Sequence, residues 1–225
     1  MAGGHFGLGL HQVLKLHSFY RSSASYRCRI ALNLKGLPYE LEFVHLVRDG
    51  GQQNAPNYRS LNPQGLLPTL EHDGRVLTQS LAIIEYLEEV WPEPHLLPAD
   101  SETRARVRAF ALAIAADTGP VNNLRVLRYL KRTHRQEQAA IDAWYRHWSD
   151  AGLRACEELL PSARHTFCFG EQPTLADIVL VPQLYNARLF QTDLSGVPRL
   201  VEIDTACRSL PAFAKAAPEV QPDAV

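Results

Sequence analysis

A run of serines between a predicted strand and a predicted helix is the first feature of this sequence that can do chemistry. Ser22, Ser23 and Ser25 precede a segment with helical spacing, and Ala24 interrupts them. The first turn of a helix has unpaired N–H groups and a partial positive charge, which stabilise an anion. A serine hydroxyl there can also donate to a thiolate, and both effects together lower a thiol pKa by about two units. Plain helix capping is the alternative interpretation, because serine is common at N-caps.

Two further segments suit the rest of a peptide-like ligand. Pro68 opens a predicted strand after Leu67, and a missing ladder donor suits a sheet edge or a point where a ligand backbone approaches. Gln79 and Ser80 begin another predicted helix, where N–H groups and a hydroxyl can hold a carboxylate while the amide meets an ammonium group. An ordinary strand start and a second helix cap are the alternatives. The order and separation of the three segments favour a binding site.

Hydrophobic periodicity predicts the elements that position these groups, in the order β-α-β-loop-β-β-α. Asp73-Gly74 lies between two short apolar runs and predicts a β-hairpin. The polar stretch around residues 50–54 is predicted to be mostly loop. The predicted elements are residues 13–19, 26–35, 39–44, 67–71, 75–77 and 79–90. This order is typical of a mixed sheet covered by helices.

The second half of the chain is predicted to be helical throughout. Three prolines within residues 92–98 suit an interdomain linker. Thr174 and Asp177 have capping-box spacing before an apolar helix, so we interpret Asp177 as a structural cap. The predicted organisation is a loose leader at residues 1–12, an α/β domain at 13–91, a linker at 92–99 and an all-helical domain at 100–225.

Composition excludes several functional classes. A formal net charge of −1 provides no overall field for nucleic acid or an anionic membrane. No apolar run approaches the roughly 20 residues of a membrane span, and the glycine-broken start of the chain makes a poor signal peptide. The four cysteines and nine histidines are dispersed without metal-ligand spacing. We therefore expect a soluble cytoplasmic protein with reduced thiols and no metal site.

Longer motifs resemble those of the zeta-class glutathione transferases, the maleylacetoacetate and maleylpyruvate isomerase family. The likeness extends over nearly all of the chain from about Val13. The matching segments are RSSASYRCRIAL at 21–32, DGGQQ at 49–53, LNP at 61–63, QSLAIIEYLEE at 79–89, NNLR at 122–125, TLAD at 174–177 and QPD at 221–223. The resemblance implies a thioredoxin-like N-terminal domain followed by an all-helical C-terminal domain, and it implies a homodimer.

The same resemblance implies glutathione as cofactor and the cis–trans isomerisation of a maleyl dicarboxylate, in aromatic amino acid catabolism. Reversible thiolate addition makes the double bond single and allows rotation. Ser22 is the first choice as thiolate partner and Ser23 the second, with Arg21 as the third catalytic residue. The implied glutathione site consists of Ser22, Ser23, Gln53, Leu67, Gln79, Ser80 and Asn123.

Arginines are expected to hold the substrate carboxylates, because a guanidinium matches a carboxylate bidentately. Arg21, Arg125 and Arg188 are the candidates. A solvated basic face is the alternative for Arg125, since four further basic residues follow it by position 135.

Three positions depart from the family pattern. Ala24 stands where several members carry cysteine, so glutathione must supply the sulfur, and Gly119 stands where relatives carry a polar residue that touches glutathione. Leu189 replaces an arginine, with Arg188 one place earlier, and one helical step turns a side chain by about 100 degrees. Two alternatives therefore remain: a transferase that conjugates or dehalogenates small electrophiles such as α-haloacids, and a non-catalytic binding module of the same fold.

Overall fold

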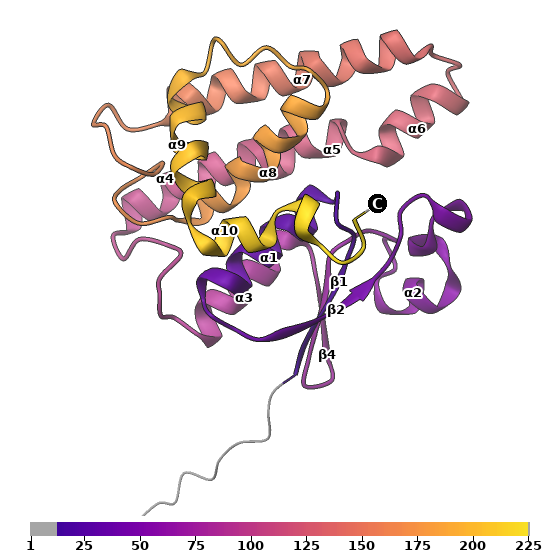
Figure 1. The fold of residues 1–225 in the computed structure, drawn as a ribbon, viewed down its shortest axis with the longest axis horizontal. Helices are drawn as coiled ribbons and strands as arrows, with labels where there is room; N and C mark the ends of the chain where they lie inside the picture. Colours follow the sequence, from indigo (N-terminus) through magenta and orange to yellow (C-terminus); the bar gives the residue numbers. More distant parts are fainter. Residues whose placement is uncertain (1–12, 225) are drawn as a thin grey trace, which may run out of the picture.

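The computed structural model describes residues 13–224. The predicted leader at 1–12 lies outside the described residues. The first part of the described chain builds a four-stranded sheet with helices against it (Figure 1). Its main elements are β1 (Leu14–Ser18), α1 (Ser23–Leu34), β2 (Tyr39–Phe43), α2 (Pro56–Leu61), β3 (Thr69–His72), β4 (Arg75–Thr78) and α3 (Ser80–Val90).

The sheet has the strand order β2-β1-β3-β4, in which β1 and β2 are parallel and the other neighbours are antiparallel. The mixed sheet agrees with the prediction. Asp73 and Gly74 have φ angles of 49° and 75°, so they turn the predicted hairpin between β3 and β4 in the left-handed region that such turns require. Leu16 on β1 and Leu70 on β3 are paired across the ladder and fully buried.

The segment predicted to be mostly loop contains more structure than its sequence indicated. Two 3₁₀ turns, η1 (Arg48–Gly50) and η2 (Gln52–Asn54), precede α2. These elements are too short to display a helical period, so periodicity could not find them. Tyr58 anchors α2, because its buried side chain donates from Oη to the carbonyl of Leu66 at 2.7 Å.

The second part of the described chain is helical, apart from one isolated bridge between Phe167 and Gly170. None of the described helices is long and apolar enough to cross a membrane. The elements are α4 (Ser101–Leu112), the π-helix η3 (Ala113–Thr118), α5 (Gly119–Val121), α6 (Leu124–Arg132), α7 (Gln138–Leu159), α8 (Leu175–Leu189), α9 (Pro198–Ser209), α10 (Pro211–Ala216) and η4 (Pro218–Val220).

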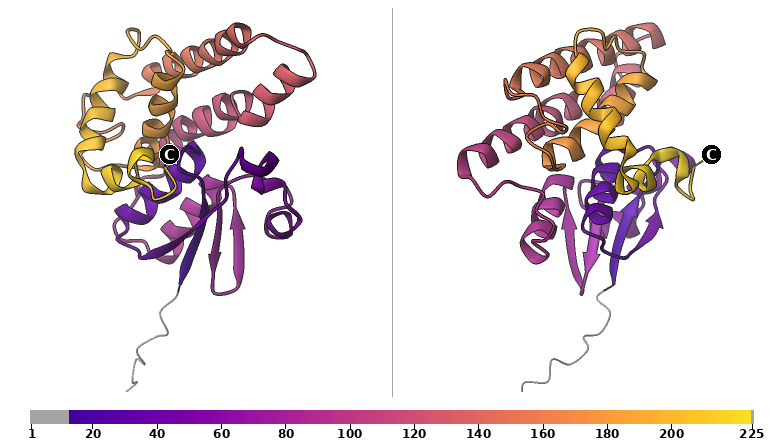
Figure 2. Two further views of the ribbon diagram at one scale, coloured as in Figure 1. Left: turned by 45° about the vertical axis from the view of Figure 1, so that its right-hand side comes forward. Right: turned by 60° about the vertical axis from the view of Figure 1, so that its left-hand side comes forward.

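The two parts share one apolar core. Helix α1 packs against α3 on its own side and against α8 and α10 of the helical part. Figure 2 shows the helical part lying along one side of the sheet domain, with the C-terminal segment returning toward the end of β1. That return ends in a hydrogen bond from the Tyr20 N–H to Asp223 Oδ2 at 2.9 Å. The start of α1 therefore lies where both parts meet.

Helix α8 runs through the centre of the helical part and is buried over most of its length. The predicted capping box is present: Thr174 Oγ1 accepts from Ala176 N–H, and Asp177 Oδ2 accepts from Thr174 N–H at 2.7 Å. Asp177 Oδ1 also accepts from Cys168 N–H at 2.8 Å. The interpretation of Asp177 as a structural cap is confirmed.

Candidate active site

The N-terminus of α1 places Ser22 at the N-cap, with an extended backbone. Its Oγ accepts a hydrogen bond from the Ser25 N–H at 3.2 Å. A hydroxyl that accepts one bond keeps its own hydrogen free to donate. The first turn contains no acidic side chain, so nothing there opposes an approaching anion. Ser22 and Ser23 are half-buried and Arg21 is exposed.

The turn before β3 presents main-chain groups. The Leu67–Pro68 peptide bond is cis. Within the described chain, no hydrogen bond uses the N–H or C=O of Leu67, whereas the neighbouring Leu66 carbonyl accepts from both Tyr58 Oη and Asn62 Nδ2. The hydrogen bonds to Leu66 fix this turn, and the free main-chain groups of Leu67 can pair with an extended peptide.

The entrance of α3 supplies the third predicted segment. Gln79 has a φ of 68°, a left-handed conformation that is costly for a residue with a side chain, and strain of this kind clusters at binding sites. Its Nε2 donates to Gln64 Oε1 at 2.7 Å. Ser80 begins α3 and is buried, and its Oγ accepts from Arg27 Nη1 at 3.4 Å.

Gln53 lies in η2, and its side chain is buried beside Gly51. Gly51 has a φ of 103°, and a Cβ there would stand 2.7 Å from Gln53 Nε2, so only glycine fits. Gln53 Oε1 is buried without a hydrogen-bond partner among the described residues. A buried acceptor left unpaired is costly unless a ligand satisfies it.

The helical part contributes the wall opposite these turns. The π-helix η3 leads into α5 and then Asn123, and π-helices are frequent at functional sites. Asn123 is the N-cap of α6, with its Oδ1 accepting from the Arg125 N–H at 3.0 Å, and the Arg125 side chain is exposed. Arg128 Nη2 donates to the carbonyl of Leu46 at 2.8 Å. Helix α6 is thereby joined to the loop after β2.

Arg188 is engaged elsewhere. Its Nη2 lies 2.7 Å from Asp204 Oδ2 on α9, and the Asp204 carboxylate is 1% exposed. Burial raises the pKa of Asp204, and the guanidinium of Arg188 opposes that rise. No hydrogen bond or ion pair in the described chain joins Arg188 to another predicted site residue. The neighbouring Leu189 is 47% exposed. A substrate carboxylate would have to compete with Asp204 for Arg188.

Two aromatic side chains near the serines were missed by the sequence analysis. The ring of Tyr185 on α8 meets Tyr26 edge-on at 6.3 Å. Burial and the neighbouring Glu219 carboxylate raise the pKa of its hydroxyl, and the charge of Arg21 opposes that rise. The ring of His45 meets Phe19 edge-on at 4.7 Å. Its Nδ1 lies 2.8 Å from the Arg48 N–H and accepts from it, so the proton of a neutral ring is on Nε2. No local motif marks either residue, because only the fold brings them here.

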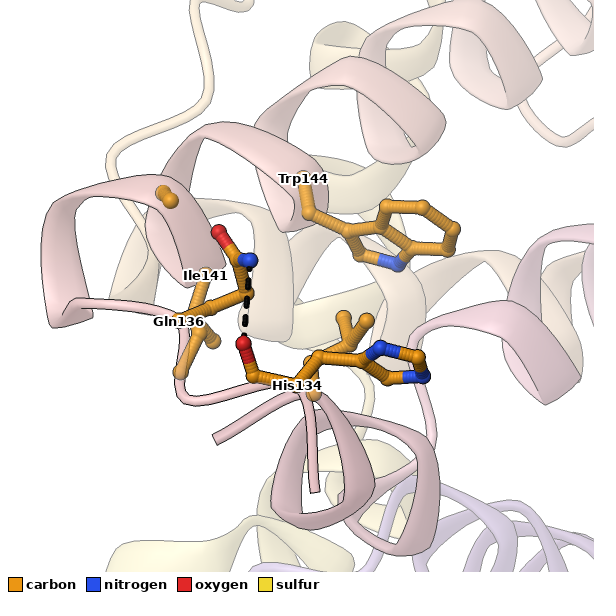
Figure 3. Close-up of a pocket in the computed structure, with 6 residues that line it drawn as sticks. His134, Gln136, Ile141 and Trp144 are labelled. Atoms are coloured by element: carbon orange, nitrogen blue, oxygen red, sulfur yellow. Dashed lines mark hydrogen bonds between the residues drawn. The ribbon is translucent and has the colours of Figure 1, made fainter. Parts of the chain in front are cut away.

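None of the predicted site residues lines the larger of the two described pockets, which opens between the end of α6 and the start of α7 (Figure 3). It has a volume of about 310 Å³, with His134 and Trp144 on facing walls. In the described chain, no group of three or more His, Cys, Asp or Glu side chains can hold a metal ion. The candidate site consists of the N-termini of α1 and α3, the entrance to β3, Gln53 in η2 and the segment from α5 to α6.

A thiol-bearing peptide fits these groups. Gln53 Oε1 and the main chain of Leu67 have no partners within the described chain, and the start of α1 offers a hydroxyl hydrogen and a first turn without acidic residues. Residues 21–90 match the family model of the glutathione S-transferase N-terminal domain, and residues 138–208 match that of the C-terminal domain. Fold and site together define a glutathione transferase, which confirms the predicted fold class.

Comparison with known proteins identifies the class of glutathione transferase to which the chain belongs. A probable maleylacetoacetate isomerase of Vibrio cholerae is 49% identical over 211 residues, covering 94% of this chain and 98% of that protein. The holo structure of a bacterial zeta-class maleylpyruvate isomerase is 49% identical with a TM-score of 0.91, covering 94% of this chain and 100% of that one. The chain belongs to the zeta-class glutathione transferases, the family of the maleylacetoacetate and maleylpyruvate isomerases.

A second solved structure bears on the ligand. The maleylacetoacetate isomerase of Anaeromyxobacter dehalogenans, with dicarboxyethyl glutathione and citrate bound in its active site, is 41% identical to this chain. The TM-score is 0.82, and the match covers 95% of this chain and 99% of that one. Glutathione is accordingly the cofactor of this family, as the resemblance implied.

Proposed function

We propose that this protein catalyses the glutathione-dependent cis–trans isomerisation of a maleyl dicarboxylate, such as maleylacetoacetate or maleylpyruvate, to the fumaryl isomer. The observation that carries the proposal is the start of α1, where the Ser22 hydroxyl keeps a free hydrogen in a turn without acidic residues. Dicarboxyethyl glutathione, bound by a relative, is the adduct expected when a thiol adds across the double bond of a butenedioate. When bound, glutathione would supply the thiolate for this addition, and the elimination that re-forms the double bond would release the same thiolate.

Ser22 stabilises that thiolate by donating its hydroxyl hydrogen, and the N–H groups of the first turn of α1 add their partial positive charge. A hydrogen bond to a charged group contributes about 1.5–3 kcal/mol. With the helix terminus, this lowers the thiol pKa by about two units from its free value near 8.5. Ser23 is the second donor at the same turn. The thiol is then largely ionised at neutral pH.

The remaining cofactor residues hold the peptide around that sulfur. The free main-chain groups of Leu67 pair with the peptide backbone. Gln79 and Ser80 hold the γ-glutamyl end at the N-terminus of α3, where a carboxylate is favoured. The unpaired Gln53 Oε1 accepts from the peptide, and Asn123 closes the site from α6. Fixing the peptide at several points orients the sulfur for attack.

Arg21 and Arg125 hold the carboxylates of the substrate. Both guanidinium groups are exposed, Arg21 at the start of α1 and Arg125 in the first turn of α6. Addition of a thiolate to the double-bond carbon β to a carbonyl moves the π electrons into an enolate, and nearby cations stabilise the negative charge on its oxygen in the transition state. Arg188 joins this group only if it leaves Asp204, so we place it at the margin of the substrate site.

The proposal also covers the oligomeric state of the enzyme, its cellular compartment and its pathway. We propose a homodimer that uses the face of α3 and α4, where Leu81, Ala82 and Leu112 line a groove of about 250 Å³ and Leu112 is 47% exposed. Four free, buried cysteines suit the reducing cytoplasm. Isomerisation of maleylacetoacetate would place the enzyme in aromatic amino acid catabolism.

One observation favours a second candidate function. Leu189 is exposed and Arg188 is paired with Asp204, so neither position adds a free cation to Arg21 and Arg125 on the substrate side. A transferase that conjugates or dehalogenates small electrophiles such as α-haloacids uses the same activated thiol with only one substrate carboxylate.

The test compares turnover of maleylacetone, a stable surrogate, with turnover of dichloroacetate, each with and without glutathione. Isomerisation that depends on glutathione and falls about 100-fold in Ser22→Ala supports the proposal. The exposed Ser101, far along the chain at the start of α4, provides the matched control Ser101→Ala, which should keep full activity. Turnover of dichloroacetate alone establishes the second function. Glutathione binding without either reaction identifies a binding module.

A further inference from the structure

Two arginines two residues apart on α1 are both buried, and they differ in their partners. Arg29 is 0% exposed and donates to three main-chain carbonyls, those of Ala216, Phe19 and Tyr20, and to Ser18 Oγ. Every one of its three nitrogens has an acceptor. It joins the end of β1 to the end of α10, so its role is structural.

Arg27 is 5% exposed, yet it makes a single hydrogen bond, from Nη1 to Ser80 Oγ at 3.4 Å. Its Nε is buried without an acceptor, and no carboxylate in the described chain lies within ion-pair distance of its guanidinium. Buried arginines are normally paired, because an uncompensated charge in the interior costs several kcal/mol. Nothing that packs on α1 provides the anion that this side chain requires.

The groups that face Arg27 come from both parts of the molecule. Ser80 lies at the start of α3 and accepts from Arg27 Nη1, and a Cβ on Gly119 of α5 would stand 3.9 Å from Nη2. Cys28 and Tyr145 are the titratable groups that act on the charge of Arg27, and burial raises the pKa of both groups, so both are neutral at pH 7. Burial lowers the pKa of Arg27 to about 10, which leaves it charged at that pH.

We propose that Arg27 is the buried counter-charge for the α-carboxylate of the γ-glutamyl group, and that it positions Ser80 to bind that carboxylate. This inference rests on the proposed function, in which Ser80 holds the γ-glutamyl end of glutathione. By donating to Ser80 Oγ, Arg27 leaves the hydroxyl hydrogen free to point toward the ligand. The positive charge beneath Ser80 then lacks an anion until the ligand arrives, and binding provides it. Arg27 is thus a positioning residue for the cofactor.

The test removes the ligand's carboxylate and the arginine separately and together, using titration calorimetry on the full chain. The ligands are glutathione and 4-aminobutyryl-cysteinyl-glycine, which lacks only the α-carboxylate. In the unaltered protein, loss of that carboxylate should weaken binding by about 10- to 100-fold, the range expected for a hydrogen-bonded charge. In Arg27→Gln the same loss should weaken binding less than about threefold, because the counter-charge is already absent.

Two controls separate this effect from general damage. Glutaryl-cysteinyl-glycine lacks only the α-amino group, and its penalty should be the same in the unaltered protein and in Arg27→Gln. Arg29→Lys removes a structural arginine from the same helix, so it should lower stability while keeping the full preference for the carboxylate. If Arg27→Gln does not fold, Arg27→Lys decides the question: it keeps the charge but loses the geometry toward Ser80, and its carboxylate preference should fall at least threefold.

An unchanged preference for the carboxylate in the Arg27 variants overturns this inference and leaves the proposed function standing. Carboxylate-dependent binding through Arg27 without isomerisation overturns the proposed function and leaves this inference standing. An unaltered protein that binds no glutathione overturns both.

Discussion

The two sides of the proposed active site are built differently. On the cofactor side, Ser22, Leu67 and Ser80 are each presented by the end of a single element, and the hydroxyls or main-chain groups remain available for a ligand. On the substrate side, Arg125 is exposed on α6 and Arg188 is paired with Asp204. The groups proposed for the cofactor are fixed by local backbone geometry, whereas those proposed for the substrate are long side chains on separate helices. Specificity can therefore change while cofactor chemistry stays the same.

The largest expected effect concerns the cap of α8, the helix that carries Arg188 on the substrate side. Asp177→Ala should destabilise the protein by about 4 kcal/mol, because it leaves the N–H groups of Cys168 and Thr174 buried without their charged acceptor. Urea unfolding at pH 7 measures the loss. Asp150→Ala is the control, since Asp150 pairs with Arg154 across one turn of the exposed face of α7 and should contribute less than about 1 kcal/mol. A loss below 1 kcal/mol for both variants would show that α8 does not depend on its cap.

The next effect concerns the cofactor side. In Ser22→Ala the pKa of bound glutathione should rise by about one to two units toward its free value near 8.5, because the hydroxyl donor is gone while the helix terminus remains. Ultraviolet absorbance of the thiolate as a function of pH measures this shift. The same titration on Ser23→Ala ranks the two serines, and a larger rise for that variant would reassign the thiolate partner.

A third prediction concerns the pair that engages Arg188. Arg188→Gln should cost about 2 kcal/mol at pH 7, less than for a fully buried pair because Arg188 is 37% exposed. Without the guanidinium, the raised pKa of Asp204 rises further. When the pKa of a carboxyl is higher in the folded protein than in the unfolded chain, protonation favours the folded state. That contribution to stability is fully present below the unfolded pKa of about 3.9, and it is lost as pH rises through the folded pKa.

The difference in free energy of unfolding between Arg188→Gln and the unaltered protein should therefore shrink as pH falls from 7 toward 4. Urea unfolding across that range measures it. Isomerase turnover at neutral pH should change less than about threefold, since Arg188 already has a partner. A rise of tenfold or more in KM would show that Arg188 leaves Asp204 to bind substrate, and the contrast between the two sides would weaken.

The smallest expected effect concerns Arg125, and it tests whether the substrate side can be changed without changing the cofactor side. Arg125→Gln should raise the KM for maleylacetone about fivefold, the contribution of about 1 kcal/mol expected from one exposed charge contact. Affinity for glutathione should stay the same, because Asn123 remains the cap of α6. Arg132→Gln, an exposed arginine at the other end of that helix, is the matched control. Equal effects of the two substitutions would favour the solvated basic face as the role of Arg125.

Local chemistry explains which predictions from sequence succeeded. The Asp73-Gly74 hairpin and the capping box before α8 each depend on a few adjacent residues, and both are present. At Ser22 the two competing interpretations are compatible, since the oxygen caps α1 while its hydrogen remains free. The elements of residues 48–61 were missed because two 3₁₀ turns and a six-residue helix are too short to show a hydrophobic period.

By itself, the sequence determined the order of the elements, the positions of the helix caps and the family, because each depends on neighbouring residues or on long contiguous motifs. Only the tertiary structure decided that Arg188 pairs with Asp204, that the ring of Tyr185 meets Tyr26 on α1, and that Arg27 is buried without an anion while every nitrogen of Arg29 has an acceptor. The partners of a charged side chain lie on other elements, and a shift of one or two positions along a helix decides which of them it meets. Burial also sets the free energy of a charge, and burial belongs to the folded chain.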